Sequence, residues 1–231
     1  MPVSKNESSN ARLINKEPDF VNDIMDEIEK NKDIITPSKV SSGIRKRKRE
    51  EEIEKQKEKI EQSEFVGLYD IIVIDPPWKY NRNYDPETSR IASPYPEMDL
   101  EELKKIDLPA NENCILWLWT THAFIFDAKK LMDIWGFDYK AILTWDKDKM
   151  GMGYWLRMQC EFCLLGIKGS PVWDIKNIRD IIREPRREHS RKPKGFYEKI
   201  SDNFVGKKAD YFSREEIPGF DRKGNDINKF Q

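Results

Sequence analysis

The residues that are best suited to take part in a reaction are Asp75, Pro76, Pro77 and Trp78, which directly follow the apolar run YDIIVI. Each proline fixes its own φ angle and has no N–H group, so the turn is stiff and presents carbonyl oxygens. A carboxylate beside such carbonyls suits a partner with two N–H donors, and the indole adds a flat face for a planar heterocycle. A nucleobase amino group fits this combination best. The alternative is a plain strand–turn corner with Trp78 in the core.

Strands and helices are expected to alternate from Tyr69 onward, which places this turn in a sheet. Near-continuous apolar strands separated by helices are typical of an α/β fold with a mostly parallel sheet covered on both faces. Ligands of such sheets bind beyond the carboxyl ends of the strands, where Asp75 is expected. The sequence predicts strands at 69–75, 114–120, 139–145, 161–168, 178–184 and 208–213, and helices at 99–106, 122–136 and 194–204.

Residues 1–65 are rich in charge and poor in aromatic residues, so we expect a helical N-terminal extension before a domain over residues 66–231. The segment PDFVNDIMDEIEKNKDII has apolar residues at helical spacing, and Pro37 and Gly43 indicate a break after it. A second, charged helix is expected beyond this break. Its basic run, Arg45–Arg49, fits either a contact with phosphates or a solvated helix face.

Composition restricts the class of protein. The formal net charge of −1 gives no overall basic signature, so any nucleic-acid contact has to come from local patches. Cys114, Cys160 and Cys163 are expected to be small buried side chains in a reducing compartment, and the four ligands of a metal site are missing. No apolar run approaches the ~20 residues that span a bilayer, and a signal-peptide core is absent. The sequence therefore predicts an intracellular, cytoplasmic protein without membrane contact.

The turn DPPW after YDIIVI resembles the catalytic signature of the DPPW family of S-adenosylmethionine-dependent N6-adenine methyltransferases. Eukaryotic members of that family modify mRNA, and prokaryotic and phage members are generally associated with DNA. The resemblance extends from Leu68 to the end of the chain and implies a Rossmann-like fold with a permuted motif order, S-adenosylmethionine as cofactor and no metal. Further matching segments are SPYPEMDLEEL, LWLWTTHAF, LTWDKDKMGMGYWLRMQCEFCLLGIKG and EPRREHSRKPKGFYEKI.

In that reaction the adenine amino nitrogen is a poor nucleophile, because its lone pair is delocalised into the ring. Asp75 and the Pro76 carbonyl would accept its two hydrogens, localise the lone pair and stabilise the positive charge that develops there. Tyr80 and Tyr95 are expected to line the substrate pocket, although Tyr80 is equally explicable as a surface aromatic. The resemblance marks as catalytic the four residues Asp75, Pro76, Pro77 and Trp78.

The resemblance also implies which residues bind the methyl donor. Lys192 precedes an expected helix, so the N–H groups of that helix and a cation would face the donor's carboxylate together. Asp210 would accept the ribose hydroxyls, with Arg214 nearby. The last polar residues either bind the adenosine half or form only a C-terminal turn. The expected donor-binding set is Asp75, Lys192, Asp210, Arg214, Asn225 and Asp226.

Two segments are expected to handle a polynucleotide. The segment between the strands at 139–145 and 161–168 predicts a mobile loop beside the site, from which Lys147 and Arg157 would reach phosphates. Trp155 is in the same loop, but its side chain could equally well cover the core. The basic segment Arg183–Lys194 is expected to form an electropositive lip.

The sequence thus predicts an adenine-N6 methyltransferase that acts on DNA, as a single chain, a homodimer or a heterodimer with a related subunit. An RNA adenosine methyltransferase is the alternative with the same chemistry, because nothing in the chain reveals recognition of a 2′-hydroxyl. A catalytically silent, nucleic-acid-binding partner subunit is the alternative from another class. An intact DPPW turn and Lys192 argue against that alternative.

Overall fold

The structure is a computed structural model that describes residues 5–62, 65–80, 96–151, 155–172, 178–188 and 191–224. Contacts divide the chain into two compact units, one of residues 1–58 with 81–96 and the other of residues 59–80 with 97–231. Along the described parts of the chain, no helix is both long and apolar enough to cross a membrane.

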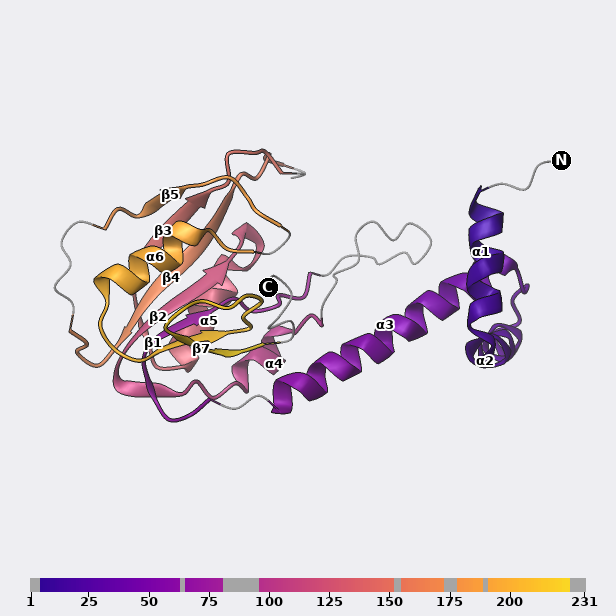
Figure 1. The fold of residues 1–231 in the computed structure, drawn as a ribbon, viewed down its shortest axis with the longest axis horizontal. Coiled ribbons are helices and arrows are strands. Elements are labelled where there is room, and N and C mark those ends of the chain that lie inside the picture. The colour runs from indigo at the N-terminus through magenta and orange to yellow at the C-terminus, as the bar shows by residue number, and fades with distance from the viewer. Residues whose placement is uncertain are drawn as a thin grey trace. The chain divides into compact units, whose positions relative to one another are not determined.

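The larger unit is built on one sheet of seven strands (Figure 1). These are β1 (Tyr69–Ile74), β2 (Ala110–Thr120), β3 (Asp138–Asp146), β4 (Cys160–Lys168), β5 (Ile181–Arg183), β6 (Lys208–Tyr211) and β7 (Phe220–Lys223). Their order across the sheet is β5-β3-β4-β2-β1-β6-β7. The pairs β1–β2, β1–β6, β3–β5 and β6–β7 are parallel, whereas β4 runs antiparallel to both β2 and β3. The predicted α/β class with a mostly parallel sheet is confirmed.

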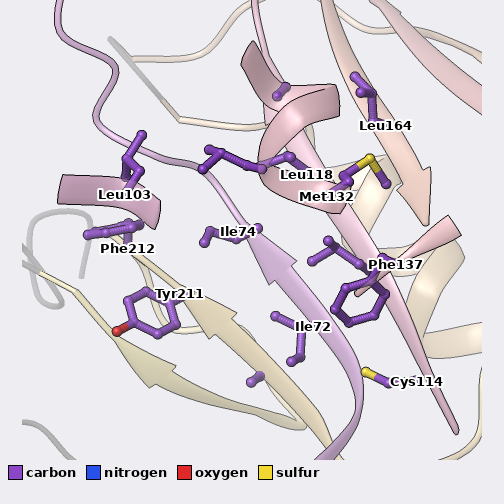
Figure 2. Close-up of a cluster of buried hydrophobic side chains, with 14 of the residues drawn as sticks. Ile72, Ile74, Leu103, Cys114, Leu118, Met132, Phe137, Leu164, Tyr211 and Phe212 are labelled. Atoms are coloured by element: carbon purple, nitrogen blue, oxygen red, sulfur yellow. The ribbon is translucent and has the colours of Figure 1, made fainter. Parts of the chain in front are cut away.

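Helices cover both faces of the sheet. Successive side chains of a strand point to opposite faces, and apolar side chains on both faces have to be buried. Ile72 of β1 belongs to a buried cluster with Met132 of α5 (Ile125–Ile134), as Figure 2 shows. The next residue, Val73, belongs to a second cluster with Phe196 of α6 (Lys194–Asn203). A strand buried on both faces leaves no room for polar side chains, which is why β1 is apolar from Ile71 to Ile74.

The short helix α4 (Leu100–Lys104) begins with the capping residue that the sequence predicts. The Asp99 carboxylate accepts a hydrogen bond from the Glu102 N–H at 2.9 Å, and the Glu102 carboxylate accepts one from the Asp99 N–H at 2.8 Å. This capping box satisfies two N–H groups that the helix leaves unpaired. The helix predicted at 122–136 is a 3₁₀ turn, His122–Phe124, followed by α5, and Gly136 ends it with a φ of +76°.

The strand β7 is not predicted from the sequence. The strand predicted at 208–213 is not the last one, because β7 adds beside β6 in parallel and forms the sheet edge. Its sequence, FDRK, is short and mostly charged, so local periodicity gives it no signal.

The described residues of the smaller unit form α1 (Lys5–Lys16), α2 (Pro18–Lys30) and most of α3 (Pro37–Gln62). The predicted break between the two helices exists but lies at residues 31–36, before Pro37, and Gly43 is inside the second helix. Thr36 accepts a hydrogen bond from the Lys39 N–H at 3.3 Å, so Pro37 lies in the first turn, where its missing N–H costs nothing. Gly43 lies inside α3, and a glycine is needed there because a Cβ would come within 2.6 Å of the Ile24 side chain. The glycine therefore allows α2 and α3 to approach closely.

The basic run Arg45–Arg49 contributes ion pairs to this helical unit. Arg47 lies 3.1 Å from Asp23 and 3.3 Å from Glu27, both on α2. Arg45 donates a hydrogen bond to Asn10 on α1. These contacts favour a structural role for the run over a phosphate contact.

Candidate active site

The site lies at the carboxyl edge of β1, β2 and β3, on the face that α6 covers. Residues two apart in a strand share a face, so charged residues at the strand ends lie on the same face as the buried residues two positions away. Asp75 and Lys147 each come two residues after a buried side chain, and Glu161 comes two residues before one. Those buried residues are Val73, Trp145 and Cys163, respectively. Glu161 reaches the same edge because β4 is antiparallel and pairs Glu161 with Trp145.

Lys192 connects two of these strands. Its Nζ lies 2.9 Å from Asp75 Oδ2 and 3.1 Å from Glu161 Oε2. β1 and β4 are separated by β2, so their backbones are about 10 Å apart at the usual strand spacing. The ammonium bridges this gap above the strand between them, 5.2 Å from the ring centroid of Trp119. The Lys192 side chain is only 9% exposed.

Two further cations complete a cluster of five charged groups. Lys147 Nζ lies 3.0 Å from Glu161 Oε1, and Arg214 Nη1 lies 4.0 Å from Asp75 Oδ2. Burial by itself would raise the pKa of Glu161, but the charges of Lys192 and Lys147 lower it to about 2. Burial likewise opposes a charged Lys192, yet Asp75 and Glu161 hold its pKa above the usual value. Both groups are therefore ionised at neutral pH.

The DPPW turn is fixed by internal contacts. The Pro76 carbonyl accepts a hydrogen bond from the Trp78 N–H at 2.8 Å, which leaves its second lone pair for a ligand. The Trp78 indole donates to the Trp119 carbonyl at 3.2 Å and stacks on Phe124 at a centroid distance of 5.1 Å. The indole is 7% exposed, so it packs in the core and supports the corner. The open stacking face expected from the sequence is occupied by Phe124.

The amino end of α6 is also satisfied within the protein. The Glu184 carboxylate accepts hydrogen bonds from the Lys194 N–H at 2.8 Å and the Gly195 N–H at 3.0 Å. The expectation that these N–H groups face the donor's carboxylate together with Lys192 is therefore corrected. Glu184 takes the place of that anion and holds the helix start.

Asp210 has a protein partner. The Tyr197 hydroxyl donates a hydrogen bond to Asp210 Oδ2 at 3.1 Å, and the residue is 2% exposed. Burial raises the pKa of the Asp210 carboxyl to about 7, although hydrogen bonds from Tyr197 and Ser213 oppose this shift. A ribose hydroxyl would have to share this carboxylate with Tyr197.

The loop between β3 and β4 is a hydrogen-bonded arm beyond the sheet. The Lys147 N–H donates to the Gln159 carbonyl at 3.2 Å, and the Gly151 N–H donates to the Met158 carbonyl at 2.8 Å. Trp155 is 90% exposed, so the interpretation that it covers the core is wrong. Arg157 is exposed on this arm, whereas Lys147 belongs to the charge cluster.

The structure brings some of the remaining candidates to the site. Tyr80 is half-buried, and its hydroxyl lies 2.8 Å from Thr121 Oγ1, next to the DPPW turn. In the expected basic lip, Arg187 and Arg191 are both paired with Glu215. One carboxylate therefore offsets part of the positive charge of these two arginines. The candidates Tyr95, Asn225 and Asp226 lie outside the described residues.

Glu161 is the residue of the site that sequence reasoning missed. It opens the apolar run EFCLLGIK, where an acidic residue looks like an ordinary polar strand end. Only the antiparallel direction of β4 places it at the edge where Asp75 lies. The usable signal was weak: an acid at the start of a strand that follows a long, charged loop.

Comparison with known proteins gives a family match over most of the larger unit. The MT-A70 family model matches residues 69–226. A type II methyltransferase from Mycoplasma, M.MunI, is 31% identical over an alignment of 181 residues. The match covers 69% of this chain and 78% of that protein. A probable N(6)-adenosine-methyltransferase MT-A70-like protein of rice is 27% identical over 71% of this chain. The human N(6)-adenosine-methyltransferase catalytic subunit METTL3 is 24% identical over 65% of it. The matched regions are only 24% and 26% of the rice and human proteins, respectively.

Proposed function

This chain belongs to the MT-A70 family of methyltransferases, and we propose that it transfers the methyl group of S-adenosylmethionine to the N6 amino group of adenine in DNA. The observation that carries the proposal is the arrangement around Asp75. This carboxylate lies at the carboxyl edge of the sheet, where α/β folds bind ligands. The closest contacts of Lys192 and Arg214 with this carboxylate are both to the same oxygen, Oδ2.

Asp75 Oδ1 can therefore accept a hydrogen bond from the adenine amine while Lys192 stays in place. The second lone pair of the Pro76 carbonyl accepts the other N–H of the amine. Two acceptors at this position localise the nitrogen lone pair and stabilise the positive charge that grows as the nitrogen–carbon bond forms. The methylated nitrogen must then lose one proton, and the carboxylate of Asp75 is the acceptor beside it.

The charge cluster fits the amino-acid end of the donor. Its three cations and two carboxylates, Asp75 and Glu161, give a net charge of +1, which favours the donor's carboxylate. Lys192 has three N–H donors, of which two go to Asp75 and Glu161 and one remains for that anion. When bound, the donor supplies a methyl carbon on a positively charged sulfur. Lys192 and Arg214 would hold it, with Asp75 beside the reacting carbon.

DNA is the proposed polymer because this chain covers most of a bacterial type II methyltransferase but only about a quarter of the adenosine methyltransferases it resembles. The direct test is incubation with labelled S-adenosylmethionine and a panel of single- and double-stranded DNA and RNA, followed by nucleoside analysis. We expect label in N6-methyl-2′-deoxyadenosine. Label only in RNA would contradict the choice of polymer, and label in another base would contradict the proposed site.

The arm between β3 and β4 is the proposed contact with nucleotides next to the target adenine. Replacing Trp155 with alanine should weaken oligonucleotide binding about 10-fold, because stacking of one base on an aromatic ring is lost. Fluorescence anisotropy of a labelled oligonucleotide measures this affinity. Val205→Ala is the matched control, since Val205 is 99% exposed but follows α6 at the opposite edge of the sheet. Equal affinities of W155A and the parent protein would exclude this contact.

We also propose that the helical N-terminal region and the methyltransferase domain are separate domains. A chain that lacks residues 1–58 should fold and bind S-adenosylmethionine as the full chain does, because the charge cluster lies entirely in the other unit. Its affinity for polynucleotide should fall. Calorimetric titration of the donor and anisotropy with an oligonucleotide test the two parts. An insoluble product, or one with unaltered oligonucleotide affinity, would count against this division of roles.

A further inference from the structure

A second group of charged residues lies behind Lys192. Glu215 is 8% exposed, and its carboxylate is shared by two arginines. Arg187 Nη2 lies 2.8 Å from Glu215 Oε1, and Arg191 Nε lies 2.5 Å from Glu215 Oε2. We refer to Glu215, Arg187 and Arg191 as the glutamate clamp.

The clamp contacts the main chain of Lys192 directly. Arg187 Nη2 donates a hydrogen bond to the Lys192 carbonyl in addition to its contact with Glu215. Arg191 immediately precedes Lys192 in the chain. The carboxylate of Glu215 thus orders two side chains, one of which touches Lys192 and one of which adjoins it.

The clamp also fixes the segment that carries Arg214. Glu215 follows Arg214, and the Glu215 carbonyl accepts a hydrogen bond from the Ser213 hydroxyl at 2.8 Å. The two cations that contact Asp75, Lys192 and Arg214, therefore come from two separate segments that meet at Glu215.

Beyond Lys192, the chain is anchored a second time by Glu184 at the start of α6. A lysine side chain has four rotatable bonds, so the position of its ammonium depends on how firmly its main chain is held. A displacement of about 1 Å at a reacting centre can lower a rate about 100-fold. The ammonium of Lys192 must contact two carboxylates on different strands, so only small displacements of its main chain are compatible with both contacts.

From these contacts we propose that Glu215 is a positioning residue, which acts through Arg187 and Arg191 to place the Lys192 ammonium between Asp75 and Glu161. The inference rests on the proposed function, in which Lys192 holds the donor beside Asp75. Glu215 itself touches neither carboxylate of the site and takes no part in the chemistry.

The test is a double-mutant cycle between Glu215→Gln and Lys192→Met. Glutamine keeps the size of the side chain and removes the charge that orders the arginines. We expect E215Q to lower kcat/KM for methyl transfer about 10- to 100-fold. In the K192M background the same change should have no further effect, because its route of action is already lost. Independent, multiplying effects of the two changes would overturn the proposal.

Glu188→Gln is the matched control. Glu188 also pairs with Arg191, at 3.0 Å, but its side chain is 57% exposed, so its loss should leave kcat/KM unchanged. Arg187→Lys covers the case in which E215Q does not fold. Lysine preserves the charge pair with Glu215 but cannot hold both Glu215 and the Lys192 carbonyl in the same way, so the rate should fall about 10-fold. Full activity of R187K would also overturn the proposal.

A measurement without methyl transfer separates this inference from the proposed function. The Glu161 carboxyl can be followed by ¹³C NMR during a pH titration of E215Q and the parent protein. Displacement of Lys192 should move the pKa of Glu161 up from about 2 towards its usual 4.5. A purely structural Glu215 would lower stability without moving that pKa. A parent protein that shows the depressed pKa but transfers no methyl group would refute the proposed function alone.

Discussion

Replacing Asp75 with alanine should lower kcat for adenine methylation about a thousandfold or more. The carboxylate is the acceptor that stabilises charge on the reacting nitrogen, and nothing else among the described residues of the DPPW turn can replace its oxygens. Incorporation of labelled methyl groups into adenine, measured at saturating donor, gives the rate. Lys192 keeps Glu161 as its partner in the variant, at 3.1 Å, so the fold should persist.

Two further variants make this prediction specific. Asp75→Asn retains one carbonyl acceptor and should keep more activity than Asp75→Ala, because part of the interaction with the amine survives. Asp127→Ala removes a carboxylate from the start of α5, where Asp127 pairs with the exposed Lys130, and should leave kcat unchanged. A normal rate in Asp75→Ala would end the assignment of this turn as the catalytic centre.

Replacing Lys192 with methionine should destabilise the protein by about 3 kcal/mol at pH 7, because two carboxylates then lose the cation that joins them. The effect should depend on pH. In the parent protein, the pKa of Glu161 lies at about 2, below its usual 4.5, and this difference corresponds to about 3 kcal/mol. A depressed carboxyl pKa stabilises the fold above the usual pKa, and the contribution is lost as the pH falls from 4.5 through 2.

The difference between K192M and the parent protein should therefore be largest at neutral pH and should shrink below pH 4.5, where Glu161 becomes protonated in the variant. Urea unfolding followed by tryptophan fluorescence at several pH values measures it. Lys194→Met is the control, since Lys194 lies two residues away but is 74% exposed and pairs with Glu198 on the surface. That change should cost less than about 0.5 kcal/mol. A deficit in K192M that is the same at all pH values would exclude a charge-based role for Lys192.

Local signals in the sequence predict the elements of the larger unit well. Alternation, apolar run length and punctuation depend on residues within a few positions of one another. The end of β1 before Asp75, the cap at Asp99 and the stop at Gly136 are all set in this way, and all three are found in the structure. The same local rules fail at Gly43, because its role is to admit Ile24 from another helix.

Which residues come together in the site is determined by the tertiary structure. Sequence indicated Asp75 and Lys192, but their pairing across 117 positions, together with the part played by Glu161, follows from the order and direction of the strands. The sequence around a lysine does not show whether its side chain faces a ligand or two carboxylates. Nor does the sequence at a helix start show whether an external anion or Glu184 caps the helix. Side-chain periodicity fixes which face of its own strand a residue occupies, and that is local. Which strands are neighbours is decided by contacts between distant segments, so the charges that meet over Trp119 were determined only by folding.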